Sequence, residues 1–187
     1  MNLNKLRDEA YSIAKANGWH EEEHSDEHWF MLIITEIAEA VQADRKNKHA
    51  DIAKFKEWQG NSLPLSEETR IRRFKEDFEA YIKNTVGDEL ADVVIRILDY
   101  CGTINFTIDY SCSDNDAIEE FSRVFNNKTF TESMFNIAKS ITRFDIQIAL
   151  LKILGLCKLY GIDIFWHIRT KMNYNRLRGY HHGGKRY

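Results

Sequence analysis

Apolar side chains recur every three or four positions along most of this chain, the spacing that places them on one face of an α-helix. Leu3, Leu6 and Ala10 begin the first such stripe, and Asn17 with Gly18 forms a stop signal that commonly ends a helix. The spacing predicts helices over residues 3–17, 25–44, 66 to about 87, 87–100, 134–141, 146–159 and 162–174.

The helical spacing is lost in two stretches. Residues 45–65 are largely polar and predict an irregular connection, and residues 102–128 give a mixed pattern in which 103–110 could form a short strand. A chain of 187 residues with one proline and nine glycines contains few helix breakers, and 43% apolar residues are ample for a core. We therefore expect an all-α helical bundle that forms a single domain over residues 1–187.

The helix predicted over residues 87–100 is apolar on nearly every side, yet it carries charge. Glu89, Asp92, Arg96 and Asp99 fall on one narrow stripe. A helix of this kind is buried, and buried carboxylates need a cation or a metal ion beside them. Arg96 could pair with Asp92 or Asp99 one turn away, which leaves Glu89 for a metal such as Mg²⁺. The alternative is an ordinary acidic face or a structural charge network.

A second predicted helix has the same construction. Glu36 and Glu39 lie about 60° apart on it, beside apolar positions. If the two acidic helices pack together, their carboxylates share one site and repel one another strongly unless divalent cations lie among them. Ligation by oxygen alone suits Mg²⁺ or Mn²⁺ rather than zinc. The expected metal ligands are Glu36, Glu39, Glu89 and Asp92.

The C-terminal end of the chain is basic, since residues 169–187 contain no acid. Lys171, Asn175 and Arg178 recur there at helical intervals and offer ammonium, amide and guanidinium groups that suit phosphate oxygens. Next to an acidic metal cluster, this pattern favours binding of a metal-bound polyphosphate. The alternatives are a solvated basic tail and an electrostatic contact with nucleic acid.

The loop after the first helix contains Trp19, which could cover the core or line a pocket. His20, His24 and His28 follow at intervals of four, a spacing compatible with a metal site on a helix. The Glu-rich sequence between them instead indicates a solvated loop with a helix start at Ser25 or Asp26. We therefore assign these histidines no ligand role.

Charge and cysteine usage narrow the function classes. A net charge of −3 favours neither nucleic acid nor a membrane surface as a partner. Cys101, Cys112 and Cys157 lack metal or redox spacing and predict reduced thiols in a cytoplasmic protein. The N-terminus has no signal-type apolar segment, and no apolar run approaches the about 20 residues of a membrane helix.

Two acidic motifs, in this order, resemble the signature of a known family. Glu36 and Glu39 form an E-x-x-E pair, and Glu89 and Asp92 form an E-x-x-D pair. The chain resembles the MazG-like, all-α nucleoside triphosphate pyrophosphohydrolases, which carry such pairs on two helices. Three further segments resemble one compact branch of that family. They are Asn17-Gly18-Trp19, the group Lys171, Met172, Tyr174, Asn175 and Arg178, and residues 182–186.

The resemblance implies a helical bundle of the MazG-like type, associated as a homodimer or homotetramer, that hydrolyses a nucleoside triphosphate to the monophosphate and pyrophosphate. It implies that Mg²⁺, or Mn²⁺ in its place, neutralises phosphate charge and orients the attacking water. The implied metal ligands are Glu36, Glu39, Glu89 and Asp92, with Glu39 or Glu36 as the catalytic base. The implied substrate contacts are Lys171, Asn175 and Arg178 to phosphate and Trp19 to the base.

The chain departs from the family pattern in three ways. Thr35 stands where many members have a further acid, so one metal contact could be absent or made through water. The separation between Glu39 and Glu89 is longer than usual, and residues 103–160 are expected to be an inserted helical segment. The rival hypothesis is a non-catalytic helical interaction protein, or one that contacts nucleic acid through its basic tail, with the carboxylates as a structural network.

Overall fold

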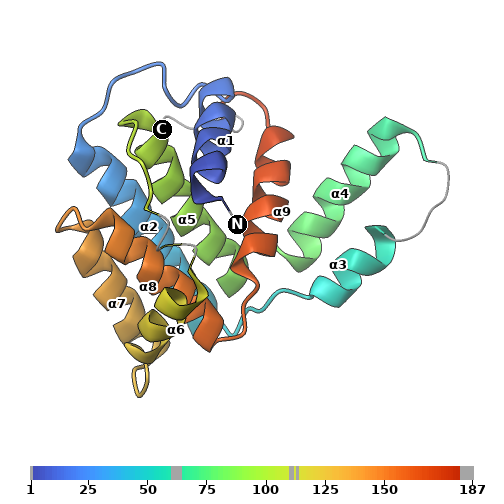
Figure 1. Cartoon of the computed structure of the whole chain (residues 1–187). Helices are drawn as coiled ribbons and strands as arrows, with labels where there is room; N and C mark the ends of the chain where they lie inside the picture. Colours follow the sequence, from blue (N-terminus) through green and yellow to red (C-terminus); the bar gives the residue numbers. More distant parts are fainter. Residues whose placement is uncertain (1, 60–64, 110–111, 113, 182–187) are drawn as a thin grey trace.

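The computed structural model describes residues 2–59, 65–109, 112 and 114–181. These residues form α-helices and no β-strand, which confirms the all-α prediction (Figure 1). Residues 182–187 of the basic tail lie outside the described residues, as do 60–64 of the predicted connection and Tyr110 of the predicted strand. The helices are α1 (Leu3–Ala16), α2 (Asp26–Arg45), α3 (Ile52–Gln59), α4 (Glu67–Tyr81), α5 (Val86–Thr103), α6 (Asn115–Arg123), α7 (Phe130–Ile141), α8 (Ile146–Leu159) and α9 (Ile164–Arg176).

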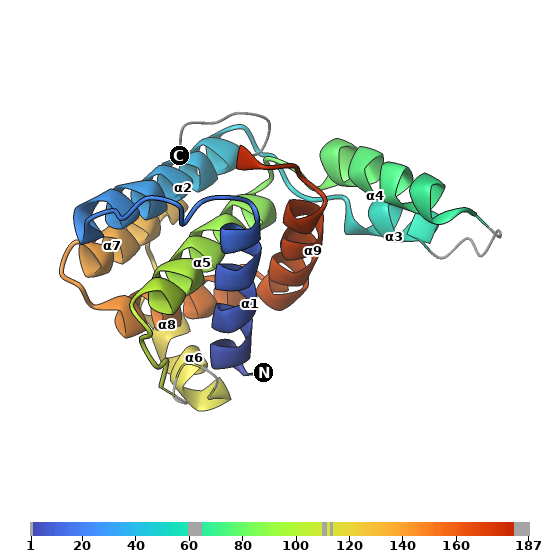
Figure 2. The same ribbon diagram turned by 90° about the horizontal axis from the view of Figure 1, so that it is seen from above.

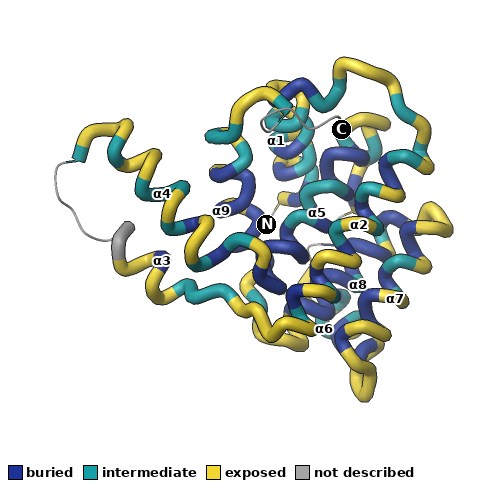
Figure 3. The backbone as a smooth tube through the Cα atoms, turned by 180° about the vertical axis from the view of Figure 1, so that it is seen from behind, coloured by how far each residue is buried: buried dark blue, intermediate teal, exposed yellow. Residues whose placement is uncertain are grey.

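Helix α5 is the centre of the bundle and contacts α1, α2, α8 and α9 (Figure 2). A helix that is apolar on almost every side is stable when other elements cover it all round. Its buried residues accordingly include the acids Asp88, Glu89 and Asp99 as well as its apolar positions. Figure 3 shows buried positions gathered along α5 and the helices around it. The centre of the fold therefore carries charge into the interior, as the sequence predicts.

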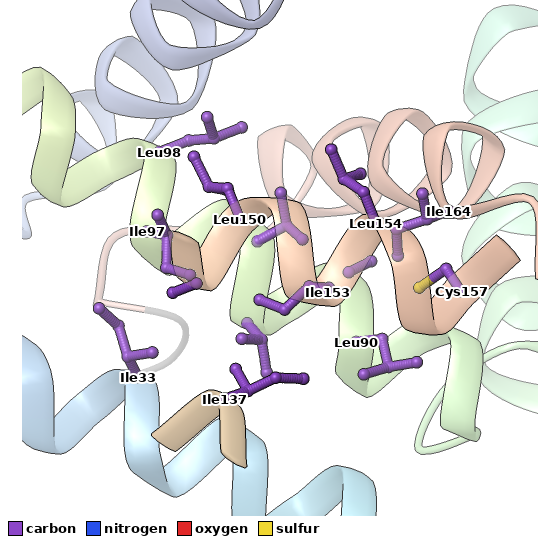
Figure 4. Close-up of a cluster of buried hydrophobic side chains, with 14 of the residues drawn as sticks. Ile33, Leu90, Ile97, Leu98, Ile137, Leu150, Ile153, Leu154, Cys157 and Ile164 are labelled. Atoms are coloured by element: carbon purple, nitrogen blue, oxygen red, sulfur yellow. The ribbon is translucent and has the colours of Figure 1, made fainter. Parts of the chain in front are cut away.

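Helices α6, α7 and α8 make up most of the expected insertion, and their apolar side chains belong to the same core as α5. Helix α8 contacts α5, α6 and α7, and α7 also contacts α2. Figure 4 shows Ile97 of α5, Ile137 of α7 and Ile153 of α8 in one apolar cluster. A Cβ on Gly155 would lie 2.6 Å from the backbone of Phe121, so glycine there permits the close approach of α6 and α8.

Helices α3 and α4 project from the bundle as a pair, which we call the arm (Figures 1 and 2). The arm has a small core of its own around Phe55 and Phe78. Tyr174 of α9 stacks on Phe78, with ring centroids 4.2 Å apart and planes at 16°. This aromatic contact joins the arm to α9, the helix that also carries Lys171 and Asn175, two of the predicted phosphate-binding residues.

The prediction of irregular chain over residues 45–65 is wrong in part, because α3 lies within it. Asp51 starts this short helix by accepting a hydrogen bond from the backbone N–H of Lys54 at 3.0 Å. Helix α4 ends at Tyr81 rather than near residue 87, since the side chain of Thr85 accepts from the backbone of the next helix and begins α5 there. Both differences arise from capping side chains, which hydrophobic spacing does not report.

The predicted strand over residues 103–110 does not form among the residues described. Helix α5 runs to Thr103, and the chain then passes beside α1. The side chain of Asn4 donates to the carbonyl of Ile108 and accepts from its N–H, both at 2.9 Å. An amide side chain thus takes both hydrogen bonds that a neighbouring strand would otherwise supply.

No helix in the described parts of the chain combines the length and hydropathy needed to cross a bilayer. Cys101, Cys112 and Cys157 are buried thiols. Burial raises the pKa of Cys101 to about 12, which keeps that sulfur protonated and unreactive near neutral pH. The cysteines therefore contribute to the core as small apolar side chains.

Candidate functional site

A cavity of about 340 Å³ lies among α1, α2, α5 and α9, the helices grouped together in Figure 2. Its lining combines acidic and basic side chains with apolar ones. Every residue predicted from the sequence to act in catalysis, metal binding or substrate binding lines it. These residues are Trp19, Glu36, Glu39, Glu89, Asp92, Lys171, Asn175 and Arg178.

Three carboxylates from two helices meet at this cavity. Glu36 of α2 and Glu89 and Asp92 of α5 each present one oxygen, and these oxygens all lie within 4.8 Å of one another. Helices α2 and α5 pack along each other, so an acid in the E-x-x-E pair faces both acids of the E-x-x-D pair. Oxygen donors gathered in this way fit Mg²⁺ or Mn²⁺ by ligand type.

Glu39, the fourth predicted ligand, is placed differently. Its residue is exposed, and its carboxylate lies outside the group of three. It nevertheless lines the same cavity, next to Glu89 and Asn84. A metal contact from Glu39 thus remains a prediction, whereas its position at the cavity rim leaves it accessible to water.

Proton affinity is perturbed at the cluster. Burial is the main cause that raises the pKa of Glu36 to about 7, with the charge of Asp92 adding to it and Arg96 opposing it. Burial also raises the pKa of Glu89 to about 8, and Asp92 and Asp88 add repulsion. A proton and a metal cation therefore compete for both carboxyl groups near neutral pH.

We expect the charge of Glu89 to destabilise the metal-free fold increasingly as pH rises from about 4.5 to about 8. The folded protein keeps a proton on Glu89 in this range that the unfolded chain releases, so the folded state loses stability with rising pH. Urea unfolding in a chelator, at intervals from pH 5 to pH 8, should show Glu89→Gln gaining stability relative to wild type. The comparison cancels groups that titrate alike in both proteins. If the difference in unfolding free energy between Glu89→Gln and wild type stays constant or shrinks as pH rises, the expectation is contradicted.

Two cations lie against the acids. Arg96 of α5 donates through Nε to Oε1 of Glu36 at 3.2 Å. The sequence allowed Arg96 to pair with Asp92 or Asp99 on its own helix, but α2 packs close enough to supply Glu36 as the hydrogen-bond partner. Lys171 of α9 lies with Nζ 2.5 Å from Oδ2 of Asp92. The acidic stripe is thus partly neutralised by side chains from other positions in the fold.

Asp88 is a member of this network that sequence reasoning missed. It is fully buried, and its Oδ2 accepts from Lys171 Nζ at 2.9 Å and from the backbone N–H of Asn84 at 3.0 Å. Burial raises the pKa of Asp88 to about 6, with Lys171 opposing the rise and Asp92 adding to it. Its Oδ1 is buried without a hydrogen-bond partner. The available signal was weak, since an acid in the first turn of a helix usually reads as a solvated charge.

The three predicted phosphate contacts all line the cavity. Burial would lower the pKa of Lys171, but Asp92 and Asp88 raise it, so the ammonium stays charged inside the protein. Asn175 has a buried Oδ1 with no hydrogen-bond partner. The guanidinium of Arg178 lies over the ring of Tyr174, 5.7 Å from its centroid. The cavity therefore collects ammonium, amide and guanidinium groups, as the spacing of these three residues predicts.

Trp19 lines the cavity, which favours the pocket reading of this residue over simple core cover. Its ring stacks on His181, with centroids 4.9 Å apart and planes at 6°. His20, by contrast, faces inward, and its Nε2 lies 2.8 Å from Oδ1 of Asp99. His24 and His28 stack on each other at 4.0 Å. These histidines thus contact other side chains of the fold, and their lack of a ligand role stays a prediction.

The comparisons with known proteins add no relative. The chain matches no family model, no curated protein and no solved structure. Its likeness to the MazG-like family accordingly rests on the sequence motifs.

Proposed function

We propose that this protein is a Mg²⁺-dependent nucleoside triphosphate pyrophosphohydrolase of the MazG-like type, which releases a nucleoside monophosphate and pyrophosphate. The observation that carries the proposal is the meeting of Glu36, Glu89 and Asp92 at a cavity that Lys171, Asn175 and Arg178 also line. Oxygen ligands and phosphate-binding groups in one cavity are what hydrolysis of a metal-bound triphosphate requires.

The residues divide the chemistry among them. Glu36, Glu89 and Asp92 would hold Mg²⁺, which supplies neutralisation of phosphate charge and orientation of the attacking water. Asn175 and Arg178 bind phosphate oxygens, while Lys171 keeps the acids partly neutralised. Glu39 lines the cavity outside the group of three, a position that suits the general base for water.

Association and location belong to the same proposal. We propose that the chain forms a homodimer or homotetramer, as the resemblance implies. Met31 of α2 and Phe135 of α7 support this, since these large apolar side chains are exposed on helices that contact each other. The buried thiols support a reducing compartment such as the cytoplasm.

Measurement of products from a panel of common and damaged nucleoside triphosphates tests the reaction. With Mg²⁺ we expect pyrophosphate and monophosphate in equal amounts, and a chelator should stop their release. Release of single phosphates would indicate a different bond cleavage. No product from any triphosphate, with a folded protein, would overturn the proposal and favour the interaction protein that binds through its basic tail.

A further inference from the structure

The cavity has a second end whose chemistry differs from that of the acid cluster. Among its lining residues, Ala10, Ile13 and Ala14 come from α1, Trp19 from the loop that follows α1, and Ile95 from α5. Small aliphatic side chains and an aromatic ring form the surroundings that a flat heterocycle prefers. If triphosphate lies at the acids, the base lies at this end.

Asp99 of α5 also lines the cavity, and its hydrogen-bond partner His20 lies in the same loop as Trp19. It is 2% exposed, and its Oδ1 lies 2.8 Å from Nε2 of His20. Burial raises the pKa of Asp99, while the hydrogen bond with His20 and the charge of Arg96 oppose the rise. In its ionised form the carboxylate can only accept, so the imidazole donates. Within the described residues, the side chain of Asp99 has no other hydrogen bond, and the carboxylate retains acceptor capacity at the cavity wall.

His20 is itself held in place on both sides. Its ring lies 4.7 Å from that of Tyr11 at 60°, and 5.2 Å from that of Trp29 at 22°. Its side chain is 8% exposed, so it has little freedom to leave Asp99. A buried carboxylate oriented by a clamped donor is pre-organised to accept hydrogen bonds from a ligand.

We propose that Asp99, positioned by His20, selects a guanine base by accepting hydrogen bonds from its N1–H and 2-amino groups; this inference rests on the proposed function for the placement of the triphosphate. Guanine presents these two donors side by side, which matches the paired oxygens of a carboxylate. Adenine presents an acceptor beside its amino group, and uracil or thymine flanks one donor with two carbonyls. With these bases, a ring nitrogen or carbonyl oxygen that can only accept would face the buried carboxylate, which also only accepts. Leaving these buried acceptors without a donor costs binding free energy.

The spacing along α5 agrees with this orientation. Asp99 follows Asp92 by seven residues, which is about 10.5 Å along a helix. That length suits a nucleotide extended from the reacting phosphates to the edge of its base. Arg96 lies between them on the same stripe and also lines the cavity. It uses Nε for Glu36, and its other N–H groups can reach an acceptor such as guanine O6.

Replacement of Asp99 by asparagine should reverse the base preference rather than only weaken nucleotide binding. The amide keeps one acceptor and gains a donor, and xanthine replaces the 2-amino donor of guanine with a carbonyl. We expect wild type to bind the α,β-imido analogue of dGTP at least about fivefold tighter than those of dITP, dXTP and dATP. Asp99→Asn should instead prefer the dXTP analogue over the dGTP analogue. Titration calorimetry measures these affinities without turnover.

The role of His20 as a positioning residue is tested by the same ratio. His20→Phe should reduce the preference for the dGTP analogue over the dITP analogue, whereas His20→Gln, which retains a donor, should restore part of that preference. Asp116→Asn, an exposed acid on α6, is the matched control and should leave the ratio unchanged. Equal binding of all bases by wild type, or an equal loss for all bases in Asp99→Asn, would overturn the inference.

The assay separates this inference from the proposed function. One outcome is that wild type prefers the dGTP analogue, Asp99→Asn reverses this preference, and no pyrophosphate is released from dGTP. This outcome would support guanine selection by Asp99 and reject the proposed enzymatic activity. The opposite outcome is that every triphosphate releases pyrophosphate with equal efficiency and that Asp99→Asn does not change this. It would support the proposed enzymatic activity and reject guanine selection by Asp99.

Discussion

Glu89→Gln is expected to lower Mg²⁺-dependent pyrophosphate release by about a thousandfold or more, because a metal ion supplies several kcal/mol of transition-state stabilisation and each 1.4 kcal/mol is about tenfold in rate. Glutamine keeps the size of Glu89 but removes the charge that a divalent cation needs. The measurement is the rate of pyrophosphate formation at saturating substrate and Mg²⁺.

Thermal unfolding distinguishes this loss from misfolding. Mg²⁺ should raise the midpoint of the wild-type protein and have little effect on the midpoint of Glu89→Gln. Without metal, the variant should be at least as stable as wild type at pH 8, since burial and the charges of Asp92 and Asp88 disfavour ionised Glu89. Glu120→Gln on α6 removes an exposed charge and should change neither rate nor midpoint. Wild-type turnover and a wild-type metal response in Glu89→Gln would reject the metal site.

Lys171→Met is expected to lower the free energy of unfolding by about 3–5 kcal/mol, the usual cost of removing one partner from a buried ion pair. Lys171 is 6% exposed and Asp88 is fully buried, so water cannot replace the lost ammonium. Asp92 loses a contact of 2.5 Å at the same time. Urea unfolding in a chelator at pH 8 measures the change.

The pH dependence and a second substitution identify the mechanism of this loss. Without the ammonium, Asp88 keeps its proton to higher pH, so the loss should be smaller at pH 5 than at pH 8. The double variant Lys171→Met with Asp88→Asn should recover much of the stability, because a neutral amide needs no counter-charge. Lys171→Arg retains the charge and should be intermediate. A loss below about 1 kcal/mol at pH 8 would mean that the ion pair is not buried in solution.

Much of the candidate site could be predicted from local sequence. Glu36, Glu89 and Asp92 were recognisable because each lies on a helix whose other positions are apolar, and the spacing of three residues places acids on one side. Lys171 and Asn175 of α9 were recognisable by helical spacing that continues to Arg178, just beyond the end of that helix. These predictions depend only on the angle between neighbouring side chains in a helix, which the sequence specifies directly.

Partners across helices could not be predicted in this way. The sequence offered Arg96 an acid on its own helix, but the packing of α2 gives it Glu36. Asp88 had no signal of burial until α9 brought Lys171 to it. The amide of Asn4 beside Ile108 removes an expected strand by joining positions 104 residues apart in the chain. Each of these outcomes depends on a distance that no local pattern contains.

By itself, the sequence determined most of the helices, the burial of the acidic helix, and the residue types that face the cavity, because periodicity and helix propensity act over a few residues. Only the tertiary structure decided which charges neutralise one another, that Glu39 lies apart from the other three acids, and that His20 holds Asp99 at the apolar end. Those features arise from packing between distant segments, where a shift of a few ångströms changes both the partner and the cost of burying a charge.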